Sequence, residues 1–69
     1  MYPLYENIRE RREELDISQE ELALRIGYKG KSMISKIENG RVDLHYSKIV
    51  AIAEALETTE AALCGWTKK

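Results

Sequence analysis

The residues of this sequence that could do chemistry are mostly basic, and they gather in its middle third. Residues 25–48 hold six Lys or Arg against two acids, a net charge of +4, whereas residues 1–24 hold three Arg against seven acids. The basic residues of the middle third are Arg25, Lys29, Lys31, Lys36, Arg41 and Lys48. Such a cluster favours contact with a polyanion such as nucleic acid, although a basic loop that merely keeps the surface soluble is an alternative.

The total charge argues in the opposite direction. The 69-residue chain has a net charge of -1, and domains that neutralise phosphates are usually basic overall. Because the positive charge is concentrated in one segment of an acidic chain, the total alone does not exclude nucleic acid as the partner.

Catalytic and metal-binding chemistry has little support in the sequence. His45 is the single His and Cys64 the single Cys, so no Cys/His set can hold a structural zinc and no internal disulfide can form. We also find no Gly-rich phosphate loop and no catalytic set of residues. We therefore expect no enzyme activity, cofactor, metal or small-molecule substrate, and we expect His45 to be a loop residue.

Five short helices are predicted to position the basic residues. Apolar residues recur at 3- and 4-residue intervals, and we find no alternating strand pattern or internal repeat. The expected helices run from Pro3 to about Leu15, from Gln19 to Ile26 behind an N-cap at Ser18, from about Lys31 to Asn39, from Tyr46 or Ser47 to Leu56, and from a cap at Thr58 or Thr59 to Gly65. Glu21, three residues after Ser18, completes a capping-box pattern.

These helices form an all-α fold of one domain, residues 1–69, with a core of about residues 4–65. No stretch of even ten residues is continuously apolar, so we expect no membrane span, no signal peptide and a cytoplasmic protein.

The second and third predicted helices form a helix-turn-helix. Gly27 and Gly30 permit a tight turn that places the third helix across the second. The exposed face of the third helix carries Lys and Ser but no acid, and a helix of this size fits the major groove of DNA. Every amphipathic helix shows a polar face to water, so on this feature alone a solvated surface is an equally good interpretation.

Three segments of the chain form a recognisable pattern, namely SQEELALRIG, MISKIENGR and IVAIAEALETTEAAL. Together they resemble the lambda-type repressor and Cro family of helix-turn-helix transcription regulators, and the resemblance covers roughly Ile8 to Leu63. It implies a compact five-helix, lambda-repressor-like DNA-binding domain. One departure is a turn that is one residue longer, since six residues separate Gly27 from Ile34 where the family pattern has five. The longer turn leaves open the register of the base contacts.

The resemblance also implies roles for individual residues. It pairs Arg12 with Glu38, which would orient the Arg towards a phosphate; a purely structural salt bridge is the alternative interpretation. Contacts to the DNA backbone fall to Arg12, Gln19, Lys29, Asn39 and Arg41. Base contacts fall to Lys31, Ser32, Ser35 and Lys36, with Met33 at the margin, because Lys can donate to guanine and Ser to either partner of a base pair.

The expected partner is a palindromic double-stranded operator, bound by a homodimer. At that site the protein would act as a repressor that occludes RNA polymerase, or would recruit the polymerase. The resemblance places the twofold contact in the last helix and the tail, at Ala61, Ala62, Leu63, Cys64 and Trp66. Trp66 could instead fold back onto the first or last helix. A rival interpretation from another class is an antitoxin or adaptor that binds a protein partner through the same fold.

Overall fold

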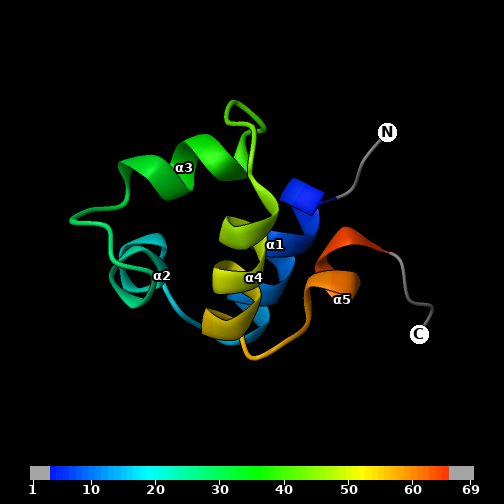
Figure 1. Ribbon diagram of the computed structural model, residues 1–69. Helices are drawn as coiled ribbons and strands as arrows, with labels where there is room; N and C mark the ends of the chain where they lie inside the picture. The colour runs from blue at the N-terminus through cyan, green and yellow to red at the C-terminus, as the bar shows by residue number, and fades with distance from the viewer. Residues whose placement is uncertain (1–3, 66–69) are drawn as a thin grey trace.

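A computed structural model describes residues 4–65 of the chain. Within that range the elements are five helices, with no strand (Figure 1). They are α1 (Leu4–Glu14), α2 (Gln19–Arg25), α3 (Ser32–Glu38), α4 (Tyr46–Ala55) and α5 (Glu60–Cys64). The all-α prediction is confirmed. None of these helices is long and apolar enough to cross a membrane. Pro3, the predicted start of the first helix, lies outside the described residues.

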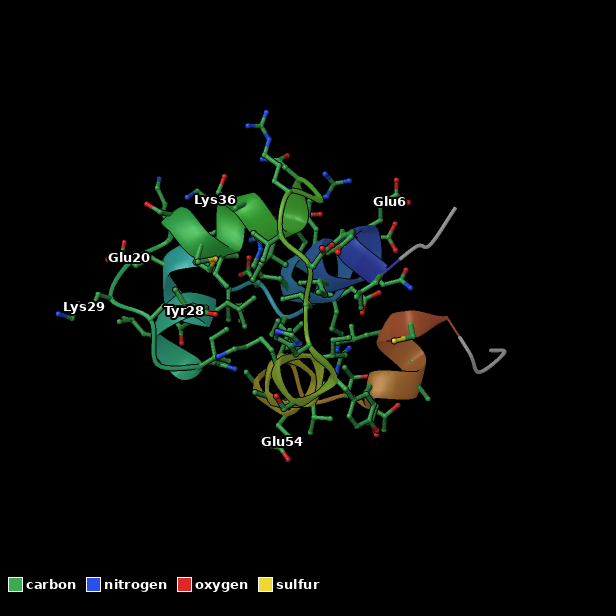
Figure 2. The ribbon with its side chains drawn as sticks, turned by 45° about the horizontal axis from the view of Figure 1, so that its top comes forward. Glu6, Glu20, Tyr28, Lys29, Lys36 and Glu54 are labelled. Atoms are coloured by element: carbon green, nitrogen blue, oxygen red, sulfur yellow. The ribbon has the colours of Figure 1, made fainter. Side chains whose placement is uncertain are left out.

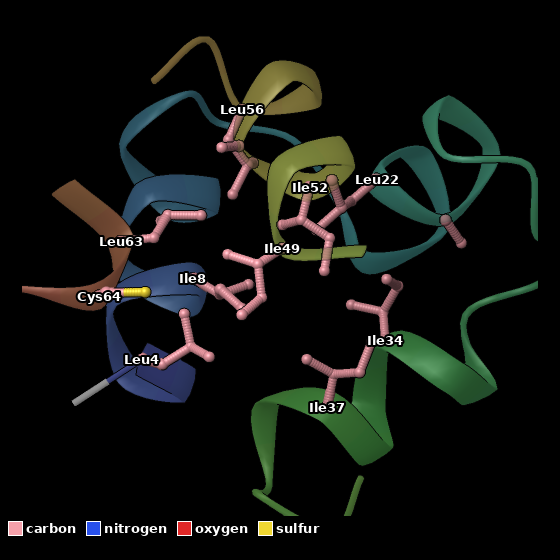
Figure 3. Packing of buried hydrophobic residues seen from close by; sticks show 12 residues of the cluster. Leu4, Ile8, Leu22, Ile34, Ile37, Ile49, Ile52, Leu56, Leu63 and Cys64 are labelled. Atoms are coloured by element: carbon pink, nitrogen blue, oxygen red, sulfur yellow. The ribbon is translucent and has the colours of Figure 1, made fainter. Parts of the chain in front are cut away.

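The core is built from one face of every helix (Figure 3). Helix α1 contributes Leu4 and Ile8 to the core. The other buried core residues, which come from the remaining helices and their ends, are Leu22, Ala23, Ile34, Ile37, Ile49, Ile52, Ala53, Leu56, Leu63 and Cys64. Burying an Ile or Leu side chain stabilises a fold by about 1.5–3 kcal/mol. Because the set is spread over five short helices, none of which is stable alone, the helices depend on one another.

Two side-chain caps define helix starts as the sequence predicts. The hydroxyls of Ser18 and Thr59 accept hydrogen bonds from the amides of Glu21 and Ala62, at 3.0 and 3.1 Å. The reciprocal half of the predicted capping box is not formed, because the Glu21 carboxylate instead pairs with Arg25 at 3.2 Å. Glu21 thus forms an i,i+4 ion pair on the exposed face of α2 in place of the capping-box hydrogen bond.

Helix α3 begins one residue later than the sequence predicts. Lys31 is the N-cap residue, has helical backbone angles (φ -80°, ψ -7°) and makes no side-chain cap. The helix ends at Glu38, with Asn39 as its C-cap, and Gly40 then takes a left-handed φ of +72°. Residues 27–31 therefore form the turn that leads into the short helix α3.

Helix α5 lies against α1, and its apolar side chains are used inside the single chain. Leu63 and Cys64 are only 2% and 4% exposed, and the carbonyl of Leu63 accepts a 2.7 Å hydrogen bond from Asn7. The expectation that Leu63 and Cys64 contact a second chain needs correction, because their side chains belong to the core. Ala61 and Ala62 keep accessible surface. Trp66 lies outside the described residues.

Candidate nucleic-acid interface

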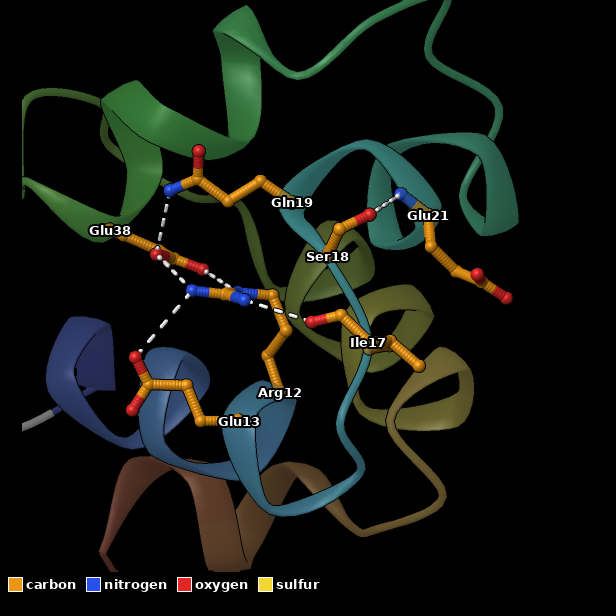
Figure 4. A network of polar contacts seen from close by, with 7 residues as sticks. All are labelled: Arg12, Glu13, Ile17, Ser18, Gln19, Glu21 and Glu38. Carbon is orange, nitrogen blue, oxygen red and sulfur yellow. Dashed lines mark hydrogen bonds and ion pairs between the residues drawn. The ribbon is translucent and has the colours of Figure 1, made fainter.

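A buried ion pair fixes the end of α3 to α1 (Figure 4). The Arg12 Nε donates to Glu38 Oε2 at 2.7 Å and its second terminal nitrogen donates to Oε1 at 3.3 Å. The remaining terminal nitrogen donates to the carbonyl of Ile17 at 2.9 Å. The side chains are 12% and 4% exposed, so solvent screens the pair only weakly. Arg12 thus joins α1, the connection to α2 and the end of α3.

Gln19 belongs to the same network. Its Nε2 donates to Glu38 Oε1 at 3.0 Å, from the first turn of α2. Glu38 therefore accepts hydrogen bonds from two helices, which locks the angle between α2 and α3. The family resemblance assigned Gln19 to phosphate, and it did not predict this contact with Glu38.

The base-contact candidates share the outer side of α3. Lys31, Ser32 and Lys36 are exposed and Ser35 is half-buried, whereas Ile34 and Ile37 on the opposite side are buried. Met33 is partly buried and packs against the core. Lys36 points away from the body of the protein (Figure 2). Three of the four candidates thus present donors to the solvent from a single helical face.

The remaining backbone-contact candidates flank α3 at both ends. Lys29 precedes the helix and lies at the outer tip of the turn, apart from Lys36 (Figure 2). Asn39 and Arg41 follow it, and all three are exposed. The Arg41 amide donates to the carbonyl of Lys36 at 2.9 Å, which holds the chain against the end of α3. Arg12 is placed differently, since its guanidinium is largely enclosed by the network described above.

The turn between α2 and α3 is held by contacts that the sequence analysis missed. The amide of Tyr28 donates to the carbonyl of Ala23 at 2.9 Å, and the Nζ of Lys48 lies 4.9 Å from the centre of the Tyr28 ring. This cation–π contact connects the turn to α4. No sequence pattern predicted it, because the two residues lie in different elements.

A second missed contact supports the segment after α3. The Tyr5 hydroxyl donates to the carbonyl of Val42 at 2.8 Å, and a Cβ placed on Gly40 would lie 3.5 Å from the Tyr5 ring. Helix α1 therefore holds the loop that follows α3 as well as the end of α3.

Two residues with shifted pKa values, Tyr46 and Glu60, lie on the surface away from α3. The Tyr46 hydroxyl donates to Glu60 Oε2 at 2.8 Å, and this hydrogen bond raises the pKa of Tyr46 and lowers the pKa of Glu60. Tyr46 is an exposed residue of α4, and Glu60 is a partly exposed residue of α5. Within residues 4–65 no group of three or more His, Cys, Asp or Glu could hold a metal ion.

Comparison with known proteins agrees with this geometry. A family model described as Helix-turn-helix matches residues 8–63. The chain belongs to the Cro/C1-type helix-turn-helix family. The family and the fold of this Cro/C1-type protein are those of DNA-binding regulators. No curated protein matches the sequence.

Three solved structures are similar to this Cro/C1-type protein. A hypothetical transcription factor, NHTF from Neisseria, is 33% identical with a TM-score of 0.82 over 88% of this chain and 69% of its own. The restriction-modification controller protein C.AhdI from Aeromonas hydrophila is 27% identical, with a TM-score of 0.82 over 90% of this chain and 92% of its own. The P22 c2 repressor, solved with a synthetic operator, is 28% identical, with a TM-score of 0.77 over 87% and 89%.

Proposed function

We propose that this Cro/C1-type protein regulates transcription by binding a specific double-stranded DNA operator through α3. The observation that carries the proposal is the exposed, acid-free face of α3, held in position at its far end by the Arg12–Glu38 pair. The P22 c2 repressor, which shares the fold, was solved with an operator. As for other DNA-binding regulators of this family, we expect the protein to act in the cytoplasm without catalytic activity.

We assign different roles to the residues around α3. Lys31, Ser32, Ser35 and Lys36 read base edges in the major groove, and the exposed residues Lys29, Asn39 and Arg41 contact the backbone. Gln19 uses one N–H of its amide on Glu38, and the second N–H remains for a phosphate oxygen. Arg12 contributes mainly by fixing Glu38, and through it Gln19, because most of its donors are already used.

The protein binds its operator as a homodimer in this proposal. Recognition helices related by a twofold axis enter successive major grooves, so the two half-sites lie about one helical turn apart, roughly 34 Å. Ala61 and Ala62 on α5 remain accessible and, together with Trp66, form the twofold contact. Small alanines permit close approach of two helices, but they bury little area, so the dimer is weak without DNA. Sedimentation of the Trp66→Ala variant tests this contact. If Trp66 takes part in it, the dimer dissociation constant of the variant is higher than that of the wild type.

Selection of bound sequences from a random duplex DNA pool, with the intact chain at near-physiological salt, tests the function directly. An enriched inverted repeat with the expected spacing supports a dimeric, sequence-specific regulator and defines which bases α3 reads. Salt-sensitive binding without enrichment contradicts it and favours the rival antitoxin or adaptor role, in which a protein partner covers the basic face. A matched selection with the Lys36→Ala variant controls for enrichment that does not depend on α3.

A further inference from the structure

Gly30 differs from the other glycines near the recognition helix. Gly27 and Gly40 have left-handed backbone angles, with φ of +93° and +72°, which disfavour any other residue. Gly30 has no such angle, and a Cβ added to it would meet no atom within 4 Å. Neither the backbone conformation nor packing within the chain therefore requires a glycine at position 30.

The turn around Gly30 is fixed on both sides by other residues, so it does not depend on the flexibility of the glycine. Tyr28 is fixed by its hydrogen bond to Ala23 and by the ammonium group of Lys48. On the other side, the carbonyl of Lys31 accepts the first hydrogen bond of α3, from Ser35 at 2.9 Å. A glycine between two fixed points lowers stability, because it loses more conformational freedom on folding than other residues do. The folded chain itself therefore offers no reason for a glycine at this position.

Gly30 lies in a basic stretch of the sequence that contains no acid. Exposed Lys29 and Lys31 flank it, and no acid occurs between residues 26 and 37. A polyanion attracted to these two lysines passes over the main chain between them. The open direction of the missing side chain is the space that such a partner can enter, since a bare Cα permits a ligand to approach the backbone closely.

We propose that Gly30 is a point of closest approach between this protein and the sugar–phosphate backbone of DNA, and that its missing side chain is a binding feature. The inference rests on the proposed DNA-binding function. It also gives the longer turn a role: the turn carries a bare segment, with a lysine on each side, onto the DNA backbone beside the groove that α3 reads.

The test adds atoms at position 30 and measures folding and binding separately. Gly30→Ala and Gly30→Val are compared with the wild-type chain and with Lys36→Ala, using thermal unfolding and titration of a labelled duplex that carries the operator obtained from the selection described above. We expect Gly30→Ala to unfold at or slightly above the wild-type temperature, because alanine restricts the unfolded chain. We expect its DNA dissociation constant to rise about fivefold or more, equivalent to about 1 kcal/mol, and that of Gly30→Val to rise further.

The outcomes separate this inference from the function on which it rests. If the wild-type chain binds, Lys36→Ala weakens binding and both Gly30 variants bind like the wild type, Gly30 has no role in binding and the proposed function stands. A lower unfolding temperature of Gly30→Ala would assign the glycine to folding and overturn the inference. If the wild-type chain binds no duplex, the proposed function and this inference fail together.

Discussion

Arg12 and Glu38 lie 26 positions apart in the sequence, yet the Arg12 Nε donates to Glu38 Oε2 at 2.7 Å. The pair closes a network that includes the Gln19 amide and the carbonyl of Ile17. It joins the three helices whose relative angles decide how the face of α3 is presented. The same pair therefore supports stability and the geometry of DNA binding.

Replacement of Glu38 with Ala should lower the free energy of unfolding by about 3–5 kcal/mol, because it leaves the Arg12 charge enclosed without its partner. Urea denaturation measures the loss. Glu38→Gln should lose less, since its amide oxygen still accepts a hydrogen bond from Arg12. The matched control is Glu21→Ala, which breaks the exposed pair with Arg25 and should cost less than about 1 kcal/mol. Equal losses for Glu38→Ala and Glu21→Ala would contradict a structural role for the buried pair.

Lys36→Ala should weaken binding to the selected operator by about 1–3 kcal/mol and relax the preference at one base position. The unfolding temperature should not change, because the side chain is exposed and makes no contact with the core. Binding titrations on the operator and on single-base variants measure the effect. Glu54→Gln is the control, because Glu54 lies on the opposite side of the molecule (Figure 2). An equal loss on all sequences would reduce Lys36 to a phosphate contact.

Glu57→Gly should stabilise the fold. Glu57 has a left-handed φ of 58° after the end of α4, a conformation that costs a residue with a side chain roughly 1–2 kcal/mol and glycine almost nothing. The gain should be less than that cost, because glycine also loses more entropy on folding. Thermal unfolding measures it. The control Glu54→Gly, inside α4, should destabilise by about 1 kcal/mol. A loss of stability at both positions would refute the strain argument.

Tyr46→Phe removes the hydrogen bond that lowers the pKa of Glu60 and raises the pKa of Tyr46. A lowered carboxyl pKa stabilises the fold above the ordinary Glu value of about 4.3, and this contribution disappears as pH falls through the lower folded value. A raised Tyr pKa acts conversely: its contribution is present below the ordinary Tyr value and is lost as pH rises through the folded value. Unfolding temperatures of both proteins should therefore differ slightly at neutral pH and converge in acid. A difference that persists in strong acid would assign the effect to packing of the ring.

Much of the fold is readable from the sequence because the signals are local. The Ser18 cap, the 3- and 4-residue spacing of Ile and Leu, and the glycines that end helices act within one or two turns of the chain. They predicted five helices with boundaries within about two residues. The start of α3 was placed one residue early, because Lys31 has helical backbone angles but precedes the first helical residue.

Site features within a single helix could be predicted from the sequence pattern, whereas most contacts between different helices could not. The exposed face of α3 followed from helical periodicity, and the Arg12–Glu38 pair came from resemblance to a known family. The contacts of Gln19 with Glu38, of Tyr28 with Lys48 and of Tyr5 with Val42 had no sequence signal. Each joins two elements, so it exists only once the helices have packed.

The sequence by itself determined the helices, the concentration of positive charge between residues 25 and 48, and the family to which the chain belongs, since all three depend on residue type and spacing. Only the tertiary structure decided which polar groups are enclosed and which stay free. It placed Leu63 and Cys64 in the core, enclosed Arg12 against Glu38, and left open space at Gly30. The physical reason is that burial depends on how neighbouring helices cover a residue, which is a property of the packed chain.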